Sequence, residues 1–135
     1  MNQDNLQPDR SPGGTQKKTS GEILTQSALD YIESHYKERF SLQAIAGELY
    51  VNGSYLLRVF KKHTGRTLLA YHNHVRCERA KELLRNTDKS VSEAGEEAGF
   101  VSSAHFTHVF KKTQGCTPTE YRYRHRLTGK EEKTP

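Results

Sequence analysis

The chain has 135 residues, a common size for one domain, and only 33% of them are hydrophobic. Its 21 Lys and Arg residues exceed its 16 Asp and Glu residues, and the net charge of +5 favours a polyanionic partner without identifying it. Because neither a membrane-spanning apolar run nor the apolar stretch of a secretion signal is present, we expect a cytoplasmic location, no membrane contact and free thiols at Cys77 and Cys116.

The two ends of the sequence differ from its middle. Residues 1–20 are rich in polar residues, Pro and Gly and have almost nothing to bury, so they are expected to be disordered or to form a linker. Residues 127–135 are expected to form a flexible charged tail. The folded domain is therefore predicted to span residues 21–126.

Apolar residues at helical spacing predict an all-α domain of about seven helices. The first helix carries the apolar residues Ile23, Leu24, Ala28, Leu29 and Ile32. The second is expected to begin after Ser41, and the third after Asn52, because both side chains can cap a helix. The third is expected to end at Gly65.

The fourth predicted helix is the longest and covers residues 68–84. A fifth and a sixth helix follow, and the sixth is capped by Ser102 or Ser103. The seventh begins with a capping-box pattern, in which Thr117 is the cap and Glu120 lies three residues later. No segment alternates convincingly like a strand.

A block of four residues occurs twice, because Val59–Lys62 recurs as Val109–Lys112, fifty residues later. Matching residues follow both copies at the same offset of fifty: Gly65 with Gly115, Thr67 with Thr117, and Tyr71 with Tyr121. Before the copies the offset is one residue shorter, and it matches Ser41 with Ser90 and Ala46 with Gly95. Each copy combines a short helix, a tight turn and a longer basic helix, which is the helix-turn-helix pattern. The sequence predicts a first unit at 21–67, a linker helix at 68–85 and a second unit at 86–126.

The most specific motifs are, in the second copy, Gly99-Phe100, Phe106, Val109–Lys112, Gly115 and Thr117–Arg122, in the first copy, Tyr55-Leu56, Arg58–Lys62 and Thr64-Gly65, and between the copies, Arg76, Arg79-Ala80 and Leu83-Leu84. With these motifs, residues 42–123 resemble the DNA-binding region of the AraC/XylS family of bacterial transcription regulators. The resemblance implies two helix-turn-helix subdomains joined by a long linker helix. It also implies sequence-specific binding of double-stranded DNA in the nucleoid, regulating transcription as an activator.

Some positions depart from the family pattern. Tyr50 stands where a turn glycine is common, and Gly95 stands where the family often has Ala. A glycine inside a helix costs roughly 1 kcal/mol relative to Ala. We expect the fold to tolerate these departures, but no base preference can be carried over from the family.

The outer faces of the two basic helices are expected to contact bases, from helical geometry and from the resemblance. The predicted base contacts are Ser54, Leu57 and Arg58 in the first helix and Ser103, Ala104, Thr107 and His108 in the second. Arg58 is expected to bind a guanine edge, worth roughly 1–3 kcal/mol of discrimination, with a phosphate or solvent contact as its alternative. Leu57 is expected to touch a thymine methyl group or to be an ordinary exposed Leu. The second set is small or weakly hydrogen-bonding, so it is expected to discriminate less.

The candidate phosphate contacts are the basic residues Lys61, Lys62, Arg66, Arg76, Lys111 and Lys112. Any one of these lysines could instead be simply solvated. Because the lysine pair occurs in both copies, phosphate contact is favoured for the set as a whole. A linker helix of about 17 residues is roughly 25 Å long. Successive major-groove segments on one face of DNA lie about 34 Å apart, so a monomer is expected to cover two of them.

Other classes of site are not predicted. Glu93, Glu96 and Glu97 are expected to face away from DNA, as a solvated face or as a contact for RNA polymerase. No cofactor and no metal site are expected, because His105 and His108 lack further ligands nearby. An enzyme is not expected, since no catalytic constellation is present. The alternative function is sequence-indifferent nucleic-acid binding, and whether the chain is a stand-alone regulator or part of a longer one stays open.

Overall fold

The computed structural model describes residues 17–133 and their side chains up to Arg126, so most of the predicted N-terminal segment lies outside the described residues. The described part forms seven α-helices and no strand. The helices are α1 (Ser20–His35), α2 (Leu42–Glu48), α3 (Gly53–Thr64), α4 (Leu68–Asn86), α5 (Val91–Glu97), α6 (Ser103–Gln114) and α7 (Pro118–Lys133). The predicted all-α fold is confirmed.

Side-chain caps start the helices of both units at matching places. Ser41 and Ser90 each accept a hydrogen bond from a backbone N–H in the first turn of α2 and α5, at 3.1 and 3.0 Å. Asn52 and Ser102 do the same for α3 and α6, at 3.1 and 3.0 Å. These bonds satisfy N–H groups that have no partner within the helix. Of the two candidates for capping the sixth helix, Ser102 is the one used.

The two basic helices also end alike. Gly65 and Gly115 follow α3 and α6 with φ angles of 78° and 82°. Their N–H groups donate to the carbonyls of Lys61 and Lys111, at 2.8 and 2.9 Å. Glycine adopts this left-handed conformation without strain, so it ends each helix sharply. The repeat therefore holds from the cap of each 12-residue helix to its end.

Two hydrophobic cores divide the molecule into its two units. The first core combines α1, α2, α3 and the start of α4, with Leu24, Ala28, Ile32, Ile45, Ala46, Leu56, Val59, Phe60 and Leu68. The second combines the rest of α4 with α5, α6 and α7, through Cys77, Ala80, Leu83, Leu84, Ala94, Ala98, Phe100, Phe106, Val109, Phe110, Cys116 and Tyr121. Helix α4 contributes buried residues to both cores and so joins the units.

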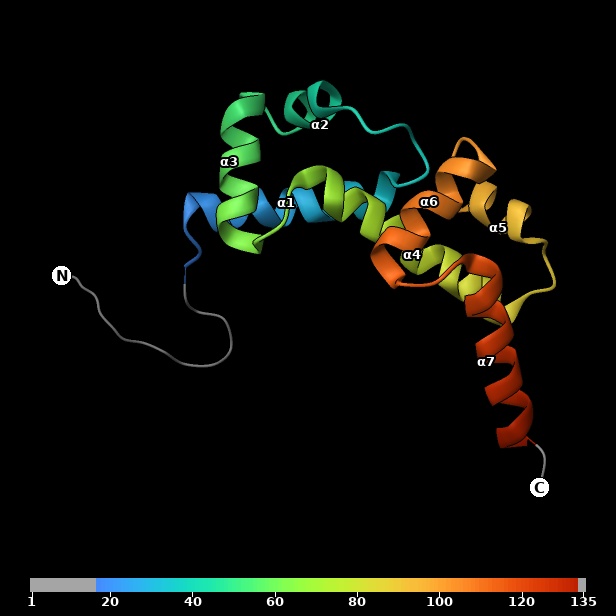
Figure 1. Cartoon of the computed structure of the whole chain (residues 1–135). Helices are drawn as coiled ribbons and strands as arrows, with labels where there is room; N and C mark the ends of the chain where they lie inside the picture. The colour runs from blue at the N-terminus through green and yellow to red at the C-terminus, as the bar shows by residue number, and fades with distance from the viewer. Residues whose placement is uncertain (1–16, 134–135) are drawn as a thin grey trace.

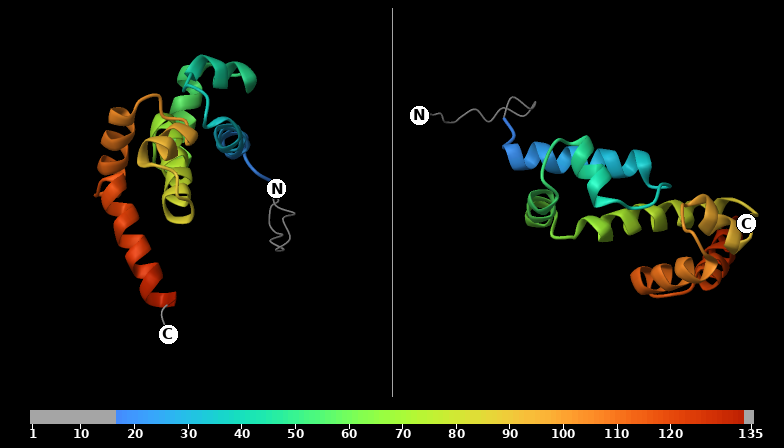
Figure 2. Two further views of the ribbon diagram at one scale, coloured as in Figure 1. Left: turned by 90° about the vertical axis from the view of Figure 1, so that its right-hand side faces the viewer. Right: turned by 90° about the horizontal axis from the view of Figure 1, so that it is seen from above.

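The units lie at the two ends of α4 (Figure 1). Helix α3 packs beside the start of α4, and α6 packs beside its second half, as the view from above also shows (Figure 2). With 19 residues, α4 is about 28 Å long. The two basic helices are therefore held by one continuous helix.

Some boundaries differ from those predicted. The chain is helical through Lys133, whereas the folded domain was predicted to end at residue 126. The capping box at Thr117 starts α7, and the Lys and Glu residues near its end favour helix. The fourth helix ends at Asn86, two residues after the predicted helix and one after the predicted linker segment.

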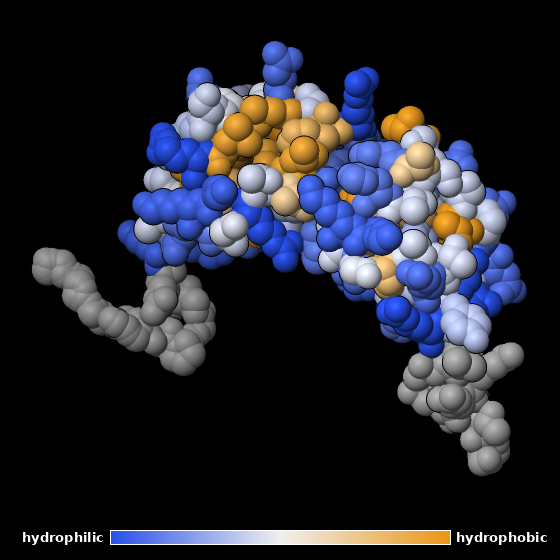
Figure 3. All heavy atoms as spheres, viewed as in Figure 1, coloured by the Kyte–Doolittle hydropathy of each residue, from blue (hydrophilic) through white to orange (hydrophobic). Residues whose placement is uncertain are grey.

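The first core is less completely covered than the second. Eight partly buried hydrophobic residues pack against it: Leu29, Tyr31, Phe40, Leu42, Leu49, Val51, Tyr71 and Val75. Among the residues whose side chains are described, Val91 alone has this position at the second core. In Figure 3, hydrophobic residues accordingly gather on the first unit around α2, whereas the second unit is mostly hydrophilic on this face.

Candidate nucleic-acid interface

The outer face of α3 carries the predicted base contacts of the first unit. Ser54, Leu57 and Arg58 are all exposed, and Leu57 is 40% exposed despite its apolar side chain. Leu56 and Phe60 lie on the opposite side and are fully buried. Because α3 contains no acidic residue, its outer face combines hydrogen-bonding, apolar and positively charged groups. These are the groups that contact base edges in a major groove.

Arg58 is held against the helix surface by an aromatic neighbour. Its guanidinium carbon lies over the ring of Tyr55, 5.1 Å from the ring centre. Tyr55 itself is 37% exposed. The cation–π contact restricts the guanidinium before any ligand binds. The sequence contained a signal of this contact, because side chains three residues apart lie next to each other on a helix.

The outer face of α6 is smaller and less charged. Ser103, Ala104 and His108 are exposed, and Thr107 is partly exposed. The Ser103 hydroxyl already accepts a hydrogen bond from the hydroxyl of Ser92 in α5, at 3.2 Å. The predicted residues thus share one face, but this face has no long planar group like that of Arg58.

The predicted phosphate contacts fall into two groups. Lys61, Lys62, Lys111 and Lys112 are exposed in the last turns of α3 and α6, and Arg66 is exposed just after α3. At these places positive charges also stabilise the negative end of the helix dipole. Five of the six predicted basic groups are therefore accessible to a polyanion.

Arg76 is the exception, and its prediction as a phosphate contact is wrong. This side chain is only 5% exposed. Its Nε donates to the carbonyl of Tyr36 at 2.6 Å, and its Nη2 donates to the carbonyl of Glu38 at 2.7 Å. Burial lowers the pKa of Arg76. A guanidinium that is enclosed and bonded in this way holds the α1–α2 loop instead of reaching DNA.

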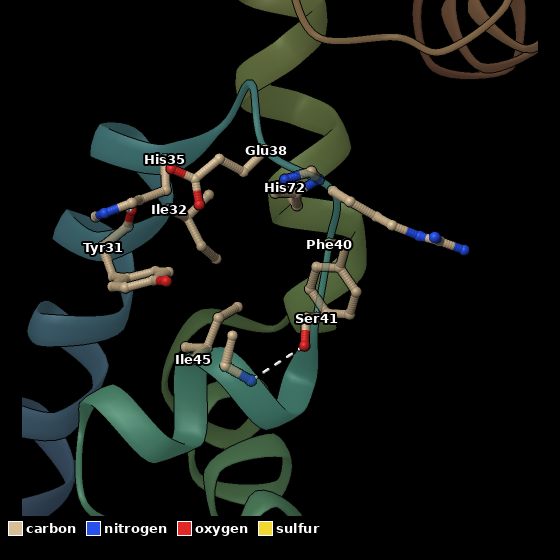
Figure 4. Close-up of a pocket in the computed structure, with 10 residues that line it drawn as sticks. Tyr31, Ile32, His35, Glu38, Phe40, Ser41, Ile45 and His72 are labelled. Carbon is tan, nitrogen blue, oxygen red and sulfur yellow. Dashed lines mark hydrogen bonds between the residues drawn. The ribbon is translucent and has the colours of Figure 1, made fainter.

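The same loop closes over a small cavity (Figure 4). Tyr31 and Ile32 of α1, Phe40 in the loop and His72 of α4 line this cavity of about 30 Å³, which has room for about one water molecule. His72 is buried against the Phe40 ring, with ring centres 5.4 Å apart. Burial and the nearby Arg76 charge lower the pKa of His72 to about 4. The cavity is thus too small for a ligand, and His72 is a packed, neutral side chain.

The acidic residues of α5 are partly used inside the fold. Glu93 forms a capping box with Ser90, and this hydrogen bonding lowers its pKa. Glu97 pairs with Lys89 at 3.1 Å and with Arg79 at 3.5 Å. Glu96 is exposed. The described residues contain no group of three or more metal-ligating side chains, and none of their helices has the length and apolar character needed to cross a bilayer.

Comparison with known proteins places this geometry in a family. A family model described as a helix-turn-helix domain matches residues 45–124. The fold is similar to that of a regulator from Chromobacterium violaceum, described as having an AraC-type DNA-binding domain, with a TM-score of 0.72 and 30% identity over 77% of this chain and 93% of that one. The chain belongs to the AraC/XylS family. It is a DNA-binding region with two helix-turn-helix units.

Two further relatives bear on function. The DNA-binding domain of the transcriptional factor AdpA, solved in complex with a target DNA, has a TM-score of 0.72 and 26% identity over 77% of this chain and 94% of that one. The transcriptional activator RhaS of Escherichia fergusonii is 37% identical over 92 residues, which are 68% of this chain and 33% of RhaS. The chain spans 33–43% of the length of the first curated relatives that it matches.

Proposed function

We propose that this AraC/XylS-type region binds double-stranded DNA sequence-specifically, with α3 and α6 in adjacent major-groove segments, and that it regulates transcription as an activator. The observation that carries the proposal is the matched pair of 12-residue helices, free of acidic residues and joined by the single helix α4. The relative RhaS, described as an activator, supports the direction of regulation.

Base discrimination is proposed to come mainly from α3. Arg58, ordered on Tyr55, suits the O6 and N7 atoms of guanine, and the exposed Leu57 suits a thymine methyl group. Ser54 lies on the same face. In α6 the proposed base contacts are Ser103, Ala104, Thr107 and His108, whose smaller groups support positioning more than discrimination.

Phosphate contacts are proposed for the exposed basic residues Lys61, Lys62, Arg66, Lys111 and Lys112. Such contacts supply affinity that falls with salt and that does not depend on sequence. Because α3 and α6 belong to one chain, a monomer is enough to bind two major-groove segments. Glu96 is the α5 carboxylate best placed for an RNA polymerase contact, because Glu93 and Glu97 have partners within the fold.

Two other functions are weighed against this one. Binding without sequence preference would use the same lysines but would have no need for an ordered Arg58. Catalysis is not proposed, because the family's members are DNA-binding regulators and the α3 and α6 faces present no acid–base pair.

Selection of bound duplexes from a random pool tests the proposal. We expect a bipartite site of about two helical turns, bound at least roughly a thousandfold more tightly than random DNA. Arg58→Ala should relax the preference at one base position, whereas Lys111→Ala should weaken all duplexes about equally. Recovery of a single-groove site, or of no preferred site, would refute the bipartite model. Equal losses on every duplex for Arg58→Ala would refute its role in base recognition.

A further inference from the structure

The two units touch directly at a glycine. Gly99 lies in the turn between α5 and α6, with φ +105°, and faces the α1–α2 loop of the first unit. A Cβ atom added there would lie 2.9 Å from the Cα of Lys37 and 3.0 Å from the carbonyl oxygen of Tyr36. Both are backbone atoms, which cannot swing aside. Only a residue without a side chain permits this approach between the units.

Arg76, which lies in α4, contacts the same place where the two units meet, which we call the junction. Besides its hydrogen bonds to the Tyr36 and Glu38 carbonyls, its guanidinium lies over the ring of Phe100, 5.6 Å from the ring centre. The Cβ added at Gly99 would also lie 3.0 Å from the Arg76 Nε. One buried side chain therefore contacts a loop of the first unit and the turn of the second.

Comparison of the two copies separates two roles of Arg76, which are holding a loop and contacting the neighbouring unit. Fifty residues after Arg76, Arg126 pairs with Asp88 and donates to the Thr87 carbonyl, and so holds the loop before α5. Arg122 donates to the Thr87 carbonyl too, at 3.1 Å. Both therefore hold a loop within the second unit. Holding the loop is common to both copies, whereas contact with the neighbouring unit is specific to Arg76.

The turn residue shows the same contrast. Tyr50 occupies the position of Gly99 in the first unit, also with positive φ, at 59°. Its side chain is 94% exposed, so among the described residues this side chain makes no close packing contact with the other unit. A side chain is thus tolerated at this turn position, and the close packing at Gly99 reflects its contact with the first unit.

Beside this contact the units separate. A groove of about 330 Å³ runs between them, lined by Lys37, Arg39 and Phe40 of the first unit and by Val101 and His105 of the second. The contact at Gly99 and Arg76 is therefore localised. Without it, the packing of α4 into both cores and the ion pair between Arg79 of α4 and Glu97 of α5 would be left to set the angle between the units.

We propose that Arg76 and Gly99 are positioning residues that fix the orientation of α6 relative to α3 and thereby the spacing of the two half-sites that the protein accepts. This inference rests on the proposed bipartite DNA binding. A spacing change of one base pair moves a half-site by about 3.4 Å and rotates it by about 35°. A rigid pair of readers loses affinity steeply under such a change, and a hinged pair does not.

The test measures binding to duplexes that carry the selected bipartite site with spacers altered by one to three base pairs. For the unaltered protein we expect a loss of about tenfold or more per base pair. Gly99→Ala and Arg76→Met should flatten this profile to about threefold and lower affinity for the best spacing about tenfold. Arg122→Met, which removes a loop contact within the second unit, and Tyr50→Ala, which changes the equivalent turn, should keep the steep profile. Steep profiles in both junction variants would overturn the inference.

A second measurement needs no DNA and tests each variant that keeps its helical circular dichroism. Spin labels at Glu48→Cys in α2 and Glu96→Cys in α5, both exposed, report the distance between the units. The distribution should be narrow in the parent protein, broad in Gly99→Ala and Arg76→Met, and narrow in Arg122→Met. Narrow distance distributions in all the variants would refute the role of Gly99 and Arg76 in fixing the orientation of the units. If the parent protein shows no bipartite site at all, the proposed function fails, while the label distances still decide the role of the junction.

Discussion

Gly95, buried in α5, offers a sharp test of how the second core is packed. By helix propensity alone, Gly95→Ala should stabilise the protein by about 1 kcal/mol. However, the added Cβ would lie 2.4 Å from Cδ2 and 2.7 Å from Cγ of Phe106, far inside normal contact. Phe106 is fully buried between Phe100 and Phe110, with ring centres 5.0 and 5.6 Å away, so its ring has little room to move.

Overpacking of this kind costs about 1–3 kcal/mol, and a clash with a confined ring belongs near the upper end. After the gain in propensity, Gly95→Ala should lower the free energy of unfolding by about 1–2 kcal/mol. Urea unfolding followed by circular dichroism measures this change. Gly47→Ala in α2 is the matched control, because its added Cβ would meet nothing within 4 Å, and it should raise stability by up to about 1 kcal/mol.

The repeat supplies a compensating change. The first unit has Ala46 and Leu56 where the second has Gly95 and Phe106, and both pairs are buried. A smaller residue at position 106 makes room for the Cβ, so Gly95→Ala combined with Phe106→Leu should be more stable than the sum of the single changes by about 1 kcal/mol or more. Stabilisation by Gly95→Ala alone, or a coupling near zero in this cycle, would refute the reasoning.

Three other changes follow from single observations. Tyr50→Gly should raise the free energy of unfolding by about 0.5–1 kcal/mol, because the relief of left-handed strain exceeds the entropy cost of glycine; an unchanged urea midpoint would argue against strain at this turn. Because the pKa of His72 is lowered to about 4 in the folded state, its contribution to stability is complete above about pH 6.5 and falls by roughly 2 kcal/mol by pH 5. His72→Gln should weaken this pH dependence of unfolding, and an equally steep profile would rule out His72 as its source. Lys112→Ala should reduce the slope of log affinity against log salt by about one, and an unaltered slope would remove Lys112 from the phosphate contacts.

Local signals in the sequence predicted most of the fold. Helix starts and ends depend on residues a few positions apart, so Asn52 and Gly65 marked α3 correctly. The repeat carried this information to the second unit. The end of α7 was missed, because polar composition over 127–133 was taken as a sign of flexibility although the same residues favour helix once a capping box has started one.

The site was predictable only where helical geometry alone decides exposure. Arg58 and Lys61 were placed correctly on the outer face of α3. Arg76 was misplaced because its acceptors, the carbonyls of Tyr36 and Glu38, lie 40 and 38 residues away in sequence and are brought to it only by tertiary packing. Charge indicates that a residue is basic, but it does not distinguish a surface guanidinium from one that holds a loop.

The asymmetry between the two units gives the junction its importance. The outer face of α6 offers small groups and lysines, which position DNA but discriminate weakly, whereas α3 offers the ordered Arg58. If the units moved independently, binding by α6 would help α3 only through proximity, and any spacing within reach would serve. If Gly99 and Arg76 hold the units at one angle, α6 can contact DNA at the same time as α3 only at certain sites. These are the sites in which the bases that α3 recognises lie at the matching distance along the DNA double helix. A rigid junction thus converts nonspecific affinity in the second unit into selectivity of the whole region.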